Sequence, residues 1–418
     1  MEELLTMRNI RKIDKDSAIA AKKILFNSYI EFEGGKPDLS EEDLNKARDK
    51  YLDVNKNFDD CLYGCFDDEV LKGVMYIKTR NMNLFGTDIK VGCDGGLAVD
   101  LLHKKERVAY SMIKESVEIS LADGGLIQTL YPFNAAFYRK MGFGYGGKVQ
   151  KYRINPLSFP KGDRSHLSFL GEDSIKDIEA CFEEYRKKYT GMMQKDSGDY
   201  LRLVKYSNRT IGYIKDGKLF GYMNLDYEVS NRHDKYIVVN ELVYNTKEAL
   251  YGFCAFFNSQ ADQYHTIHIN SHDEFLHFIV EDAKRDKKDV DMPDNNETYT
   301  YYPGVMYRIT DLKGIIDTVE HNFGGKTLKL QLDIADDIFG DKSYGIEFNN
   351  GKASNVDIGS CDVKVSMNIA DFSSMFMGTI DFKSLLSYGL AEIDNDKYID
   401  DIECIFRTDR PPMCTKFF

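Results

Sequence analysis

Residues 95–146 constrain the fold of this chain more than any other stretch. An apolar run, Leu97-Ala98-Val99, is typical of a strand, and a basic cluster of Lys104, Lys105 and Arg107 follows it. Behind the cluster, apolar residues recur at helical spacing, which predicts a helix with one face packed on a sheet. This face contains Val108, Met112, Ile113, Val117 and Leu121. Because the first N–H groups of a helix lack partners within it, the basic turn is predicted to bind a phosphate or pyrophosphate.

A second strand at residues 126–130 and the motif Tyr138-x-x-x-Gly142-Phe143 complete the pattern. The order strand, basic turn, helix, strand and tyrosine resembles that of a GNAT acetyltransferase. At the turn this family has Arg/Gln-x-x-Gly-x-Gly/Ala; Lys104 and Ala109 fit its two ends, whereas Arg107 stands in the place of glycine. Glycine there lets backbone N–H groups approach pyrophosphate closely. The arginine side chain could swing outward and add a charge-assisted contact, or it could narrow the site.

The resemblance implies that acetyl-CoA is the co-substrate, and it assigns roles along this stretch. Backbone groups of Leu97, Ala98 and Val99 would pair with the pantetheine arm, since splayed strands expose unpaired N–H and C=O groups. Backbone amides of the turn would hold the pyrophosphate, from Lys104, Lys105, Arg107, Val108 and Ala109. Asn134 would reach the cofactor, although helix N-capping explains it equally well. Tyr138 would be the general acid that protonates the departing thiolate, and a core aromatic is the alternative interpretation.

The 418 residues suggest two or three domains, and three fits best. A net charge of −13 argues against nucleic acid as the main partner, because phosphate binding needs a basic face. The charge is compatible with a cationic substrate, or simply with a solvated acidic surface. No apolar run reaches the roughly 18 residues of a membrane span, and the N-terminal sequence does not resemble an export signal. A cytoplasmic protein without a membrane partner is therefore expected, with its eight scattered cysteines as free thiols.

Two polar, proline-bearing segments, at residues 155–164 and 284–304, indicate domain boundaries. Between them, a strand at 236–244 and a helix at 247–257 repeat the order of the first unit, but their turn lacks the basic cluster. A degenerate copy without cofactor is expected. Its histidines could suggest a metal site, but they straddle a strand end and a helix start, so no metal is predicted. These histidines are His265, His268, His272 and His277.

Beyond residue 305, strands of period two at 328–334, 344–348 and 363–369 precede helices at 382–390 and 396–406. Such a sheet could enclose an apolar groove. Two GNAT-like units followed by this unit, and by an end that reads Pro412-Met413-Cys414-Thr415-Lys416-Phe417-Phe418, resemble the Eis (enhanced intracellular survival) acetyltransferases. The resemblance implies an α/β fold with mixed sheets: GNAT domains at 1–155 and 156–300, then a sterol carrier protein-like α+β domain at 301–418.

The Eis resemblance also implies an unusual general base, the terminal carboxylate of Phe418, acting with Tyr138 as the acid. A terminal carboxylate is ionised at neutral pH, and a buried aromatic ring would reduce its hydration and raise its basicity. A hydrophobic terminal residue docked for stability is the alternative interpretation.

The resemblance suggests primary amines as acceptors: aminoglycosides, polyamine-like molecules or lysine side chains. Residues at the end of the first predicted helix (17–32) could line an amine pocket, or they could be a solvated helix end. These are Tyr29, Glu31, Phe32 and Glu33. A homo-oligomer, a hexamer by family analogy, is also expected. The competing hypothesis is a non-enzymatic protein whose last unit binds an apolar ligand.

Overall fold

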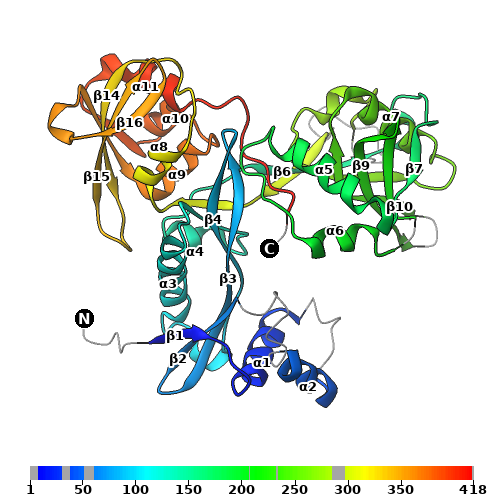
Figure 1. Cartoon of the computed structure of the whole chain (residues 1–418), viewed down its shortest axis with the longest axis horizontal. Helices are drawn as coiled ribbons and strands as arrows, with labels where there is room; N and C mark the ends of the chain where they lie inside the picture. The colour runs from blue at the N-terminus through cyan, green and yellow to red at the C-terminus, as the bar shows by residue number, and fades with distance from the viewer. Residues whose placement is uncertain are drawn as a thin grey trace.

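A computed structural model describes residues 8–30, 38–50, 61–206, 208–231, 234–284 and 297–416. These residues form three lobes, each built on one mixed sheet (Figure 1). The predicted fold class, tandem GNAT-like units followed by a smaller α+β unit, is confirmed. In the parts of the chain that are described, no helix is both long and apolar enough to cross a membrane.

The first sheet has the strand order β1-β2-β3-β4-β5-β13. Its strands are β1 Asn9–Lys12, β2 Leu62–Asp67, β3 Val70–Leu84, β4 Thr87–Val99, β5 Ile127–Leu130 and β13 Met306–Ile309. Helix α3 (Val108–Ala122) covers one face, while α1 (Ala18–Ser28) and α2 (Glu41–Lys50) lie on the other side (Figure 1). Phe85 and Gly86 connect β3 to β4 with φ values of 52° and 93°, and this pair of positive angles suits a tight hairpin.

The second sheet has the order β12-β6-β11-β10-β9-β8-β7. Its strands are β6 Lys148–Ile154, β7 Leu167–Phe169, β8 Thr210–Lys215, β9 Lys218–Asn231, β10 Asp234–Tyr244, β11 Thr266–Ser271 and β12 Tyr299–Pro303. Its helices are α5 Ile175–Arg186, α6 Ser197–Val204 and α7 Lys247–Asn258. An antiparallel β9–β10 pair, then α7, then β11 parallel to β10, repeats the order β3, β4, α3 and β5 of the first unit. The internal repeat predicted from the sequence is therefore present in the topology.

The third sheet has the order β16-β15-β14-β17-β18. Its strands are β14 Leu328–Ala335, β15 Lys342–Asn349, β16 Lys352–Val356, β17 Val363–Asn368 and β18 Ala391–Ile393. Its helices are α8 Leu312–Thr318, α9 Ile369–Phe376, α10 Phe382–Ser387 and α11 Ile399–Phe406. One pocket of this unit, about 490 Å³, is lined partly by charged side chains: Asp333, Asp341, Lys342 and Glu392.

The three units exchange strands where the chain passes between them. β6 precedes the predicted boundary at residue 155 but pairs with β11 and β12 in the second sheet. β13 follows the predicted boundary at residue 300 but pairs with β5 and completes the first sheet. Consequently β13 forms an edge of the first sheet, and β6 lies between β11 and β12 in the second, so strand pairing ties the units together.

Helix α3 differs in one respect from its predicted amphipathic face. Leu121 was expected on the buried face, but it is 37% exposed. Ser116 and Ser120 are buried instead, because they face polar side chains of the sheet, Asp94 and Gln128. A pattern of apolar residues could not show that the sheet beneath the helix carries polar groups.

Candidate active site

Strand β4 has one open backbone edge near its end. It pairs in parallel with β5 only from Val91 to Asp94, whereas its pairing with β3 continues to Val99. A bulge interrupts the β3–β4 register between Gly95 and Ala98, where Gly96 has a φ of 55°. Bulges bend a strand and end its pairing on one side. Residues 97–99 therefore have no β5 partner in the described structure, as expected of a strand that receives an extended ligand.

Tyr29 lies against this edge. Helix α1 ends at Ser28 rather than at the predicted residue 32, and Tyr29 forms its C-cap. The Tyr29 hydroxyl donates a hydrogen bond to the Leu97 carbonyl oxygen at 3.0 Å. The structure thus brings together two residues predicted to bind different substrates, the amine and acetyl-CoA. Glu31, Phe32 and Glu33 lie outside the described residues, so their roles stay predictions.

The basic turn follows directly. Lys105 and Arg107 have φ values of 70° and 61°, in the left-handed region that favours glycine. Arg107 is the N-cap of α3 but provides no side-chain cap, so the first N–H groups of the helix are left for another acceptor. Among the described residues, the exposed side chains of Lys104, Lys105 and Arg107 have no hydrogen-bond or ion-pair partner. Glu106, by contrast, is neutralised by Lys72, whose Nζ lies 3.1 Å from Oε2, and contacts His103 at 3.0 Å.

Replacing Arg107 tests whether its side chain contacts phosphate or narrows the site. Arg107→Gly and Arg107→Ala both remove the charge, so we expect each to weaken acetyl-CoA binding about tenfold if the arginine contacts phosphate. Only glycine adopts the left-handed backbone at position 107 without strain. The free energy of unfolding should therefore be about 1 kcal/mol higher for the Gly variant than for the Ala variant. Calorimetric titration and urea unfolding measure the two effects. Tighter binding in both variants would show instead that the side chain narrows the site.

Tyr138 lies in the short helix α4 (Ala135–Arg139) and is 4% exposed. Its ring packs with those of Phe133 and Phe137 and belongs to the same apolar cluster as Val99 and Val108. Burial raises the pKa of its phenol well above the usual range, and Tyr29 and Asp94 raise it further. The group is therefore protonated at neutral pH. Its hydroxyl makes no hydrogen bond to another described residue.

The segment after Tyr138 is fixed by Arg308 of β13, which is itself held by Asp336 of the third unit. Gly142 has a φ of 80°, and an ideal Cβ there would lie 1.6 Å from the Arg308 guanidinium, so only glycine fits. Arg308 donates to the Met141 carbonyl oxygen at 3.1 Å and forms a buried ion pair with Asp336. Asn134 caps α4, accepting from the Phe137 N–H at 3.2 Å. The capping interpretation of Asn134 is therefore observed, and its contact with the cofactor stays a prediction.

Asp94 is a residue of this site that the sequence analysis missed. It is buried at the last β4–β5 pair, where its carboxylate accepts hydrogen bonds from Gln128 Nε2 at 2.9 Å and Ser116 Oγ at 3.1 Å. Burial raises its pKa to about 7. The signal in the sequence was an aspartate inside an apolar strand, between Cys93 and Gly95.

The stability of the protein should depend on pH through Asp94. Because its pKa in the folded state exceeds the ordinary value, the folded chain keeps a proton that the unfolded chain has lost between about pH 4 and pH 7. The free energy of unfolding of the wild type should thus fall by about 2–3 kcal/mol from pH 5 to pH 8 relative to Asp94→Asn. Urea unfolding at both pH values checks this, with the exposed Asp262→Asn as the control. Parallel pH dependence in all three proteins would contradict it.

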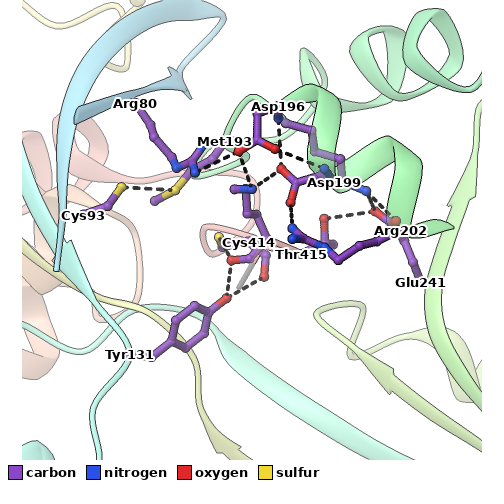
Figure 2. Close-up of polar contacts among 12 residues, drawn as sticks. Arg80, Cys93, Tyr131, Met193, Asp196, Asp199, Arg202, Glu241, Cys414 and Thr415 are labelled. Carbon is purple, nitrogen blue, oxygen red and sulfur yellow. Dashed lines mark hydrogen bonds and ion pairs between the residues drawn. The ribbon is translucent and has the colours of Figure 1, made fainter. Parts of the chain in front are cut away.

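The C-terminal segment returns to this region from the far end of the chain. Tyr131, directly after β5, donates its hydroxyl to the Lys416 carbonyl oxygen at 2.9 Å and to that of Cys414 at 3.4 Å (Figure 2). Lys416 is the last described residue and is only 4% exposed. Phe418, the predicted base, lies outside the described residues, and its catalytic role stays a prediction.

Two histidines of the second unit, His268 and His272, have hydrogen-bond partners within the protein. His272 Nε2 lies 2.9 Å from the Cys414 carbonyl oxygen, and His268 contacts Thr266 Oγ1 at 3.0 Å while stacking on Tyr236. Among the described residues, no group of three His, Cys, Asp or Glu side chains could hold a metal ion.

Comparison with known families agrees with this geometry. The acetyltransferase (GNAT) domain family matches residues 9–146, and the sterol carrier protein domain family matches residues 320–415. The protein is therefore an acyltransferase that carries a GNAT acetyltransferase domain and a C-terminal sterol carrier protein domain. Among curated protein sequences, no relative matches the chain.

Solved structures with the same overall fold include a GCN5-related N-acetyltransferase from Anabaena variabilis, with a TM-score of 0.80, 15% identity and coverage of 98% of this chain and 100% of that one. A probable N-acyltransferase of unknown function from Enterococcus faecalis has a TM-score of 0.78 and 16% identity, covering 99% and 100%. Eis1 from Mycobacterium abscessus has a TM-score of 0.74 and 14% identity, covering 98% and 100%. The resemblance to Eis proteins is thereby confirmed at the level of the fold.

Proposed function

We propose that this protein transfers the acetyl group of acetyl-CoA directly to a primary amine, on an aminoglycoside, a polyamine-like molecule or a lysine side chain. The observation that carries the proposal is the open edge of β4 beside an uncapped, cationic helix start, with the protonated Tyr138 in the same apolar cluster. Residues 97–99 offer backbone groups to the pantetheine arm. Residues 104–109 offer free N–H groups and three cations to the pyrophosphate.

In the proposed reaction, the terminal carboxylate of Phe418 accepts a proton from the substrate ammonium, and the free amine attacks the thioester carbonyl carbon. This first proton passes from the carboxylic acid to solvent. As the C–N bond forms and the C–S bond breaks, the nitrogen gives its second proton to the same carboxylate. The CoA thiolate then takes the proton of Tyr138, whose phenolate is reprotonated from solvent or from the carboxylic acid. The backbone of Lys416 is hydrogen-bonded to Tyr131, directly after β5, and Phe418 follows two residues later. This position of the C-terminal segment supports the assignment of the base.

Calorimetric titration with acetyl-CoA tests the first half of the proposal. We expect saturable binding in the micromolar range, and no detectable heat at millimolar acetyl-CoA would contradict the proposed function. Following thiol release with kanamycin, spermidine and a lysine-containing peptide as separate acceptors tests the second half. A protein that binds acetyl-CoA but acetylates none of these amines would overturn the proposed substrate class.

A further inference from the structure

The end of the described chain is held mainly by the second GNAT-like unit. The Met413 N–H donates to the Thr190 carbonyl oxygen at 2.8 Å, and the Cys414 carbonyl oxygen lies 2.9 Å from His272 Nε2. The Thr415 hydroxyl donates to Glu241 Oε1 at 3.5 Å. Backbone and side-chain groups of three consecutive residues are therefore bound by one unit, although these residues belong in sequence to the sterol carrier protein domain.

Lys416 adds a buried charge to these contacts. Its ammonium pairs with Asp199 and lies 3.5 Å from Asp196 Oδ2, while its carbonyl oxygen accepts from Tyr131 of the first unit. A buried ammonium is stable only where carboxylates compensate it. Lys416 is thus fixed at both ends, by a side-chain ion pair on one side and a backbone hydrogen bond on the other.

The two aspartates are oriented independently of Lys416. They form the capping box of α6, in which Asp199 N–H donates to Asp196 Oδ1 at 3.0 Å and Asp196 N–H donates to Asp199 Oδ2 at 2.9 Å. Arg80, from β3 of the first unit, contacts Asp196 Oδ2 at 3.1 Å, and Arg202 pairs with Asp199. Figure 2 shows Arg80, Asp196 and Asp199 near Cys414 and Thr415. These carboxylates therefore form a rigid receptor for the Lys416 ammonium.

The second unit lacks the features that would make it a second acetyltransferase. Its helix α7, which corresponds to α3, is capped by Thr246, whose hydroxyl accepts from the Ala249 N–H at 3.2 Å. Its turn also has no basic cluster. We therefore look for a role of this unit in its contacts with residues 413–416, which lie directly before Phe418 in the chain.

We propose that Lys416, Asp199, Asp196 and Arg80 form a latch that positions the terminal carboxylate for catalysis, with the second GNAT-like unit as its receptor. The inference rests on the proposed function of Phe418. Two residues span at most roughly 7 Å, so fixing Lys416 limits where the terminal carboxylate can reach. Lys416 is a positioning residue in this scheme, since it acts through Phe418 and contacts no reacting atom.

The test compares Lys416→Met and Asp199→Asn with Arg186→Met in the full-length protein. Arg186 is 1% exposed and joins the second unit to the first through Asp88, at 2.6 and 2.9 Å, without touching the C-terminal segment. It is therefore a matched control for loss of a buried ion pair between units. We expect the turnover number of Lys416→Met and Asp199→Asn to fall about 10- to 100-fold, with the KM for acetyl-CoA unchanged. Lys416→Arg should restore most of the turnover, and Arg186→Met should keep it per folded molecule.

Two further measurements separate failure of the latch from failure of the proposed function. Carboxypeptidase should release the terminal phenylalanines faster from Lys416→Met than from the wild type or Arg186→Met. In a chain that lacks Phe418, adding Lys416→Met should lower turnover no further. Unchanged turnover in Lys416→Met, while removal of Phe418 still lowers it, would overturn the latch and leave the base in place. Unchanged turnover on removing Phe418, with faster release in Lys416→Met, would overturn the proposed base instead.

Discussion

Blocking the terminal carboxylate is expected to lower the turnover number about 10²- to 10⁴-fold, which is the usual contribution of a general base. Appending one glycine after Phe418 converts its carboxylate into a peptide carbonyl, which cannot accept the proton at neutral pH. The side chain of Phe418 is retained, so the change removes only the carboxylate of this residue. Acetyl-CoA affinity should stay the same, because the basic turn and the β4 edge lie elsewhere in the chain.

Matched variants separate the carboxylate from the aromatic ring. Phe418→Leu keeps the carboxylate and should retain most of the turnover, whereas removal of Phe418 moves the carboxylate back by one residue and should lose it. The acid limb of the pH–turnover profile should disappear in the glycine-extended protein, since that limb reports protonation of the base. Steady-state kinetics across pH 5 to 9 measure these effects. Equal turnover in the extended and wild-type proteins would exclude the carboxylate from the mechanism.

Tyr138→Phe is the second change with a large expected effect, a decrease in turnover of about 10²- to 10⁴-fold. The thiolate would leave without a proton donor, while the ring contacts with Phe133, Phe137 and Phe143 persist. The hydroxyl makes no hydrogen bond to another described residue, so its loss should change the free energy of unfolding little. Acetyl-CoA titration should give an unchanged affinity.

Tyr145→Phe is the control for Tyr138→Phe. Tyr145 is 42% exposed and lies in the same segment, with its ring near the Arg139 guanidinium. It should keep full turnover. Burial raises the pKa of Tyr138, so the wild type should show no alkaline loss of turnover from this group below about pH 10. An alkaline limb at lower pH that vanishes in Tyr138→Phe would contradict the protonated state assigned to the phenol.

Local patterns in the sequence predicted most of the elements around the site. Helix α3, strand β5 and α4 occur within a few residues of their predicted positions, because helical spacing, capping residues and strand runs act over short distances. The left-handed backbone of Arg107 agrees with the glycine expected at that position. The exposed Leu121 and the buried Asp94 were not foreseen, since both depend on which side chains of the sheet lie beneath α3.

By itself, the sequence determined the order of the units, the basic turn, the motif at Tyr138 and the unusual end of the chain. Tertiary structure alone decided that β13 completes the first sheet and that β6 joins the second. It also decided that Lys416 is buried between Tyr131 and the aspartates of α6. The physical reason is that strand pairing and buried ion pairs join residues far apart in the chain. Their partners are fixed by the packing of whole units, which short-range spacing does not encode.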